Sequence, residues 1–198
     1  MDTLLFNLIW ILPLITVLAC APISAQKETL LKTIHAVSGT LVLLLVGYLT
    51  YRLYTLGIDS ASAESAPLLL HYYMDIPWIH TFNAHYSVGA DGLNMFLLFL
   101  TAVIVWAGIL VSWKIKGNQK VFFALIQLLA TSVYGVFMSM DLVLFFVFYE
   151  MEALCMYLMI AGYGSGRKDY GGKKLTLTLA FGSSMILATL LASTSKAE

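Results

Sequence analysis

The chain has 198 residues, of which 60% are hydrophobic and only 11% are charged. Soluble globular domains usually carry about 25% charged residues, so this composition excludes a soluble domain and predicts an integral membrane protein. The formal net charge is +0, which gives no reason to expect a nucleic-acid partner. Cys20 and Cys155 both fall in apolar runs, so we expect buried thiols and neither a disulfide nor a metal site.

Six apolar segments approach the ~20 residues that a membrane-spanning helix needs. They cover approximately residues 4–22, 30–56, 92–113, 121–140, 142–162 and 173–193. Continuous apolar runs of this kind exclude a β-barrel, whose strands are short and alternate in polarity. The sequence therefore predicts an all-α membrane protein with about six transmembrane helices, forming one domain over residues 1–198.

The first segment could be mistaken for a signal peptide. Asp2 precedes it, no Lys or Arg does, and its apolar run is longer than the core of a typical signal peptide. We therefore expect this segment to be a retained transmembrane helix.

The cations are distributed unevenly among the connections, and this predicts the orientation of the chain. Nine of the eleven Lys and Arg residues follow the first, third and fifth segments: Lys27, Lys32, Lys114, Lys116, Lys120, Arg167, Lys168, Lys173 and Lys174. Cytoplasmic loops carry such an excess, so both termini are expected on the non-cytoplasmic side. The connection after the second segment is acidic and rich in aromatic residues, which predicts a short β-hairpin at the outer surface. After it, Asp91 is expected to cap the third helix.

Two carboxylates stand in the middle of an apolar run that begins after Asp141. From residue 142 to 162 the helix would span about 31 Å, close to the ~30 Å of the hydrocarbon core. Glu150 would lie about 12 Å from its start, where an ionised carboxylate costs about 3 kcal/mol on insertion scales. Intramembrane acids usually serve function, so we expect Glu150 to take up and release protons. The alternative is that it only makes an interhelical hydrogen bond.

Other candidate residues are weaker. Glu152 is about 200° around the helix from Glu150, so it cannot face the same partner; a second transport role and a plain polar contact remain equally open. Lys173 and Lys174 are expected mainly to snorkel and set topology, although either could feed a hydrated path. His35 could relay protons or be only an interfacial polar residue.

No sequence pattern in the chain indicates a bound cofactor or an enzymatic centre. His71, His80 and His85 do not match a metal-ligand pattern, and there is no phosphate loop, CxxC pair or nucleophile triad. Gln127 and the pair Thr131 and Ser132 could line a water path or bond across helices.

Two blocks of the sequence resemble a known family. They are SVGADGLNMFLLFLTAVIVWAGILVSW (residues 87–113) and GVFMSMDLVLFFVFYEMEALCMYLMI (residues 135–160). These are similar to the V-G-x-D-G-[LI] and D-L-x-L-F-F-x-x-W-E motifs of subunit M, also called chain 4, of respiratory complex I, the proton-translocating NADH:quinone oxidoreductase. The Glu-Met-Glu triplet is most similar to the version of this subunit found in photosynthetic membranes.

The resemblance implies an antiporter-like subunit of the membrane arm, in an energy-transducing membrane of a bacterium or organelle. NADH or another donor, iron–sulfur clusters and quinone would be held by partner subunits, and no cofactor by this chain. Glu150 matches the family's essential glutamate of helix five, which pairs with a lysine on helix seven. That helix is not in this sequence, so the lysine is expected on another chain or further along a longer protein. Tyr149 and Cys155 replace the family's Trp and Pro.

Two rival functions fit the same residues. A subunit of a cation/proton antiporter or membrane-bound hydrogenase would come from the same superfamily. A truncated structural or assembly subunit would have no transport role, and there Glu150 would be replaceable by Gln without loss of pumping.

Overall fold

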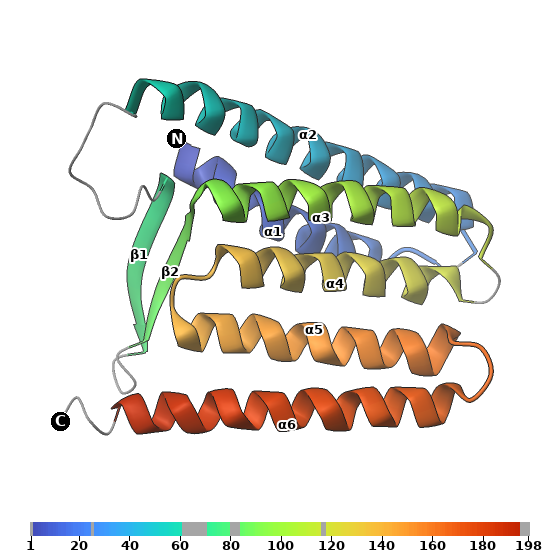
Figure 1. Ribbon diagram of the computed structural model, residues 1–198. Coiled ribbons are helices and arrows are strands. Elements are labelled where there is room, and N and C mark those ends of the chain that lie inside the picture. Colours follow the sequence, from blue (N-terminus) through green and yellow to red (C-terminus); the bar gives the residue numbers. More distant parts are fainter. Residues whose placement is uncertain (1, 25, 61–70, 80–83, 116–117, 195–198) are drawn as a thin grey trace.

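The computed structural model contains six long helices and a two-stranded hairpin, described for residues 2–24, 26–60, 71–79, 84–115 and 118–194. The helices are α1 (Asp2–Cys20), α2 (Glu28–Ser60), α3 (Gly92–Val111), α4 (Gln119–Met138), α5 (Leu142–Tyr163) and α6 (Lys168–Thr194), with a 3-10 turn η2 (Ser112–Lys114) after α3. Figure 1 shows their axes side by side, with the hairpin across one end. The start of α1 and the end of α6 lie at that same end.

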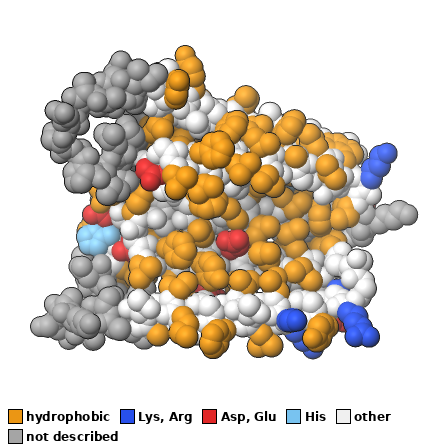
Figure 2. Space-filling view, viewed as in Figure 1, with side chains coloured by type: hydrophobic (Ala, Val, Ile, Leu, Met, Phe, Trp, Pro, Cys, Tyr) orange, Lys and Arg blue, Asp and Glu red, His pale blue; other side chains and the backbone are white. Residues whose placement is uncertain are grey.

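Five of the described helices are long and apolar enough to cross a membrane: α1, α2, α3, α4 and α5. Exposed apolar side chains cover the face seen in Figure 2, and those of Phe96, Ile104 and Leu154 are each about 60% exposed. Such a surface is suited to contact with the hydrocarbon core of a membrane. These observations confirm an all-α membrane protein. The sixth predicted segment also forms a helix, α6, which begins at a stretch containing Lys168, Asp169, Lys173 and Lys174. Its crossing of the membrane, and the side on which the termini lie, stay predictions.

The hairpin joins α2 to α3. Strands β1 (His71–Ile79) and β2 (Ala84–Ala90) are antiparallel, and the register shifts between His71 and Met74. Tyr72 sits in this irregularity with a φ of 60°, and its ring stacks on Phe6 while its hydroxyl donates to the carbonyl of Leu49. The bulge thus turns an aromatic side chain of the hairpin into the helical core.

Two apolar clusters hold the helices together. The larger, at the hairpin end, joins residues of α1 to α5 and β2, among them Phe6, Val46, Met95, Tyr134 and Phe148. The smaller is built on Ile109, Phe122 and Phe123. Cys20 and Cys155 are both buried free thiols, as predicted.

Helix α5 packs between α4 and α6. Gly135 of α4 lies directly against the ring of Phe148 on α5, and that ring also meets Trp10 of α1 edge-on at 5.5 Å between centroids. On the other side, Gly172 of α6 lies against Tyr157, and Gly182 against Tyr149. Gly135 and Gly172 therefore set the close approach of α5 to α4 and to α6, whereas a Cβ at Gly182 would make only ordinary contact.

A long-range contact closes the carboxyl end of α1. The Nζ of Lys120, at the start of α4, donates to the carbonyl oxygens of Ala21 and Ile23 at 2.7 and 2.8 Å. Both carbonyls lie in the turn that follows α1, which ends at Cys20, so the start of α4 holds this turn in place.

Candidate functional site

Helix α5 carries the two glutamates, and Asp141 fixes where that helix begins. The Asp141 carboxylate accepts hydrogen bonds from the backbone N–H groups of Val143 and Leu144, at 2.8 and 3.1 Å. The helix then runs unbroken from Leu142 to Tyr163. Glu150 is eight residues from its start, which places it about 12 Å along the axis. The cap therefore sets the depth of Glu150.

The two carboxylates belong to different faces of α5. Glu150 is three residues after Val147 and four before Leu154, both exposed, whereas Glu152 is four residues after Phe148 and three before Cys155, both buried. Residues three and four apart share a helix face. Both glutamates are half-buried. Figure 2 shows an acidic side chain among apolar side chains near the middle of the face in view. A carboxylate is costly within the hydrocarbon core of a membrane.

Neither glutamate has a hydrogen bond or ion pair within the described residues, whereas Asp75 and His85 of the hairpin do pair with each other. Lys173 and Lys174 are exposed near the start of α6. Helices α5 and α6 run in opposite directions and Gly182 lies against Tyr149, so Lys174 is about seven residues from the level of Glu150, about 10 Å along the helix. The structure does not bring either lysine to Glu150.

His35 lies elsewhere, in the interior between α2 and α4. Its side chain is completely buried, and its ring stacks on Phe123 at 5.8 Å between centroids. The amide of Gln127 donates to the His35 carbonyl at 3.2 Å. The hydroxyls of Thr131 and Ser132 bond to carbonyls of their own helix. His35 therefore belongs to a different part of the structure from Glu150.

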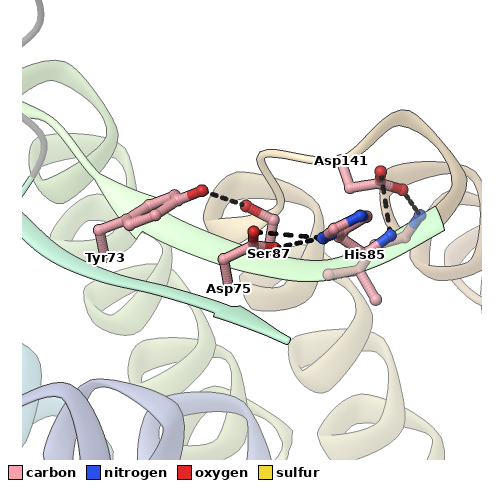
Figure 3. Close-up of polar contacts among 6 residues, drawn as sticks. Tyr73, Asp75, His85, Ser87 and Asp141 are labelled. Atoms are coloured by element: carbon pink, nitrogen blue, oxygen red, sulfur yellow. Dashed lines mark hydrogen bonds and ion pairs between the residues drawn. The ribbon is translucent and has the colours of Figure 1, made fainter. Parts of the chain in front are cut away.

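Sequence reasoning missed the anchor between the hairpin and α5, which Figure 3 shows. Besides capping α5, Asp141 accepts the backbone N–H of His85 at 3.4 Å. Nδ1 of His85 lies 3.1 Å from the carboxylate of Asp75 on the opposite strand. The backbone N–H of Met140 also donates to the carbonyl of Ser87 at 2.8 Å. Asp75 and His85 were visible in the sequence, but their pairing depends on the strand register.

The described residues hold no group of three His, Cys, Asp or Glu side chains that could bind a metal ion. His71 and His80 have side chains outside the described part of the chain.

Comparison with known proteins shows to which family the chain is related. No protein-family model matches the chain. It is 34% identical over 145 residues, or 68% of its length, to NAD(P)H-quinone oxidoreductase chain 4 of the chloroplast of Chara vulgaris. The chain is homologous to chain 4 of the NAD(P)H-quinone oxidoreductases. A cyanobacterial chain 4, from Picosynechococcus sp., is 33% identical over 72% of this chain.

The chain spans about a third of these chain 4 relatives: 29% of the Chara protein and 35% of the chain 4 of Chaetosphaeridium globosum, to which it is 29% identical over 88% of its own length. A solved structure titled as the membrane-bound sulfane sulfur reductase, an archaeal respiratory membrane complex, contains a similar fold. The match covers 92% of this chain and 35% of the chain in that structure, with a TM-score of 0.71 and 20% sequence identity, and it shows the fold alone.

Proposed function

We propose that the chain is an antiporter-like membrane subunit of a complex I-type quinone oxidoreductase, and that Glu150 carries a proton across part of the bilayer. The relatives are chain 4 subunits of such enzymes. The observation that carries the proposal is the position of Glu150: about 12 Å into a membrane-length helix, half-buried, and without a basic partner among the described residues.

The mechanism is electrostatic. An uncompensated carboxylate in hydrocarbon favours proton uptake, and an approaching cation favours release. Redox chemistry in other subunits would move that cation or change the hydration near Glu150. The lysine partner would come from other membrane-arm subunits or from residues beyond those given. NADH or another donor, iron–sulfur clusters and quinone would be held by partner subunits. The membrane would be the energy-transducing membrane of a bacterium, chloroplast or mitochondrion.

The other candidate residues receive secondary roles. Lys173 and Lys174 would bring protons or water to the bundle from the surface where α6 begins. Glu152, on the α4 side of α5, would serve a separate contact and not share the cation of Glu150.

The experiment substitutes Glu150→Gln, with Glu152→Gln as the matched control on the same helix. We expect the Glu150 variant to assemble normally and to lose proton pumping in inside-out vesicles, while the Glu152 variant keeps most of it. Normal pumping by Glu150→Gln would contradict the proposal and favour a structural or assembly subunit. Isolation of the chain with a hydrogenase or a sodium antiporter would instead place it in another complex of the superfamily.

A further inference from the structure

The strongest unexplained feature of the structure is the imidazole of His35. The residue is 0% exposed, and neither ring nitrogen has a hydrogen-bond partner among the described residues. A buried polar group without a partner costs roughly 1–3 kcal/mol. A neutral imidazole has one N–H donor and one acceptor nitrogen. Without a partner, His35 would therefore lose one donated and one accepted hydrogen bond. Internal water commonly supplies such missing partners.

Other buried polar side chains lie in the same part of the bundle as His35. Ser38, one turn further along α2, accepts a hydrogen bond at 2.8 Å from the Thr16 hydroxyl of α1, and both residues are buried. The amide of Gln127 from α4 reaches the His35 carbonyl, and Thr131 is completely buried one turn beyond it. Three helices thus contribute buried polar side chains near one level of the bundle. An internal water needs two to four such partners.

We propose that His35 binds internal water within the packing of α1, α2 and α4, and that it relays protons there. A protonated water gives a proton to the free nitrogen of the neutral imidazole, and the resulting imidazolium gives up the proton of its other nitrogen to a second water. The positive charge thus passes from the first water to the second and leaves the ring neutral as its other tautomer, which returns to the first by proton exchange with the same two waters. His35 lies seven residues from the start of α2, about 10 Å along the axis, so the water site is within reach of the surface at which α2 begins.

This inference rests on the proposed function, because a relay has meaning only if the assembly moves protons. The site is nevertheless separate from Glu150, which lies on α5. The apolar alternative is that His35 is simply a core ring stacked on Phe123. The relay and the apolar alternative predict different rates of proton pumping when His35 is replaced by a residue whose ring has no nitrogen.

The test compares His35→Phe with Thr33→Val in the whole assembly. Phe keeps the stacked ring and removes both polar atoms. Thr33 is exposed on the same helix, and its hydroxyl donates to the carbonyl of Thr29 one turn earlier. We expect His35→Phe to assemble, to be at least as heat-stable as the parent protein, and to pump protons severalfold more slowly, while Thr33→Val pumps normally. An experimental map of the parent assembly should show water within hydrogen-bond distance of a His35 ring nitrogen.

Pumping by His35→Phe at the parent rate, or a map with no water at either nitrogen, would overturn the relay. If His35→Phe fails to assemble, His35→Gln takes its place, because its amide bonds to water and cannot pass a proton through. Glu150→Gln is measured beside them. Loss of pumping in that variant together with normal pumping in the His35 variants refutes the relay alone, whereas normal pumping in all of them refutes the proposed function.

Discussion

The contact between Gly135 and Phe148 gives the sharpest prediction, because it decides how α5 lies on α4. A Cβ added at position 135 would overlap several carbons of the Phe148 ring. That ring is buried, and it is also held edge-on by Trp10. Overpacking of this kind costs about 1–3 kcal/mol, and a severe overlap with a confined ring belongs at the upper end. The higher helix propensity of Ala returns at most about 1 kcal/mol. We expect Gly135→Ala to destabilise the protein by about 2 kcal/mol, a factor of about 30 in the folded-to-unfolded ratio.

The matched control is Gly108→Ala in α3, where an added Cβ would meet nothing within 4 Å. The assay is the temperature at which the buried thiol of Cys155 on α5 becomes reactive to a maleimide, measured in the purified assembly with Cys20 replaced by Ser. Gly135→Ala should label at a lower temperature than Gly108→Ala. Adding Phe148→Leu should restore part of the loss by making room for the new methyl group. Equal labelling of the two single variants would refute the packing argument.

Two further predictions concern the hairpin end. Asp141→Ala removes the cap of α5 and the hydrogen bond from the backbone of His85, so it should lower the stability by about 0.5–2 kcal/mol. Asp141→Asn keeps an acceptor oxygen and should lower the stability less. Equal losses of the two variants in thermal melts would contradict the capping role. Burial raises the pKa of the Tyr86 phenol, and the hydrogen bond from the Trp10 indole lowers it by a smaller amount. The unfolded chain therefore ionises first as pH rises, and the stability that this phenol contributes is lost as pH passes through its folded pKa. Trp10→Phe should raise that pKa further, which ultraviolet titration of the phenolate would detect, and an unchanged or lower value would count against the bond.

Composition and the lengths of the apolar runs were enough to predict the helices, because a bilayer imposes one length and one polarity on each crossing. The predicted start of α3 is confirmed by its cap, since the Asp91 carboxylate accepts the N–H of Asn94 at 2.7 Å. Helix ends were less accurate: α2 begins at Glu28 and α6 at Lys168, because charged turns extend a helix beyond its apolar segment. The opposition of Glu150 and Glu152 followed from helix geometry alone.

The contacts between elements could not be predicted in this way. Lys120 was counted only as a charge that sets orientation, and His85 only as a histidine outside any metal-ligand pattern. Their partners lie far away in the sequence or on a neighbouring strand, and hydropathy contains no information on such pairs. The isolation of His35 from Glu150 likewise depends on which helices meet, and this is a property of packing.

The bond from Lys120 to the end of α1 also bears on how the protein is made. A ribosome synthesises α1 about a hundred residues before it reaches α4. The carbonyls of Ala21 and Ile23 therefore have no hydrogen bond from Lys120 until the fourth helix has entered the translocon. During that interval water or lipid headgroups must solvate them. The contacts of α1 are therefore complete only after α4 has been made. A nascent chain that stops before α4 would leave the carbonyls after α1 without their lysine, and the quality-control proteases of its membrane would meet an incompletely packed helix.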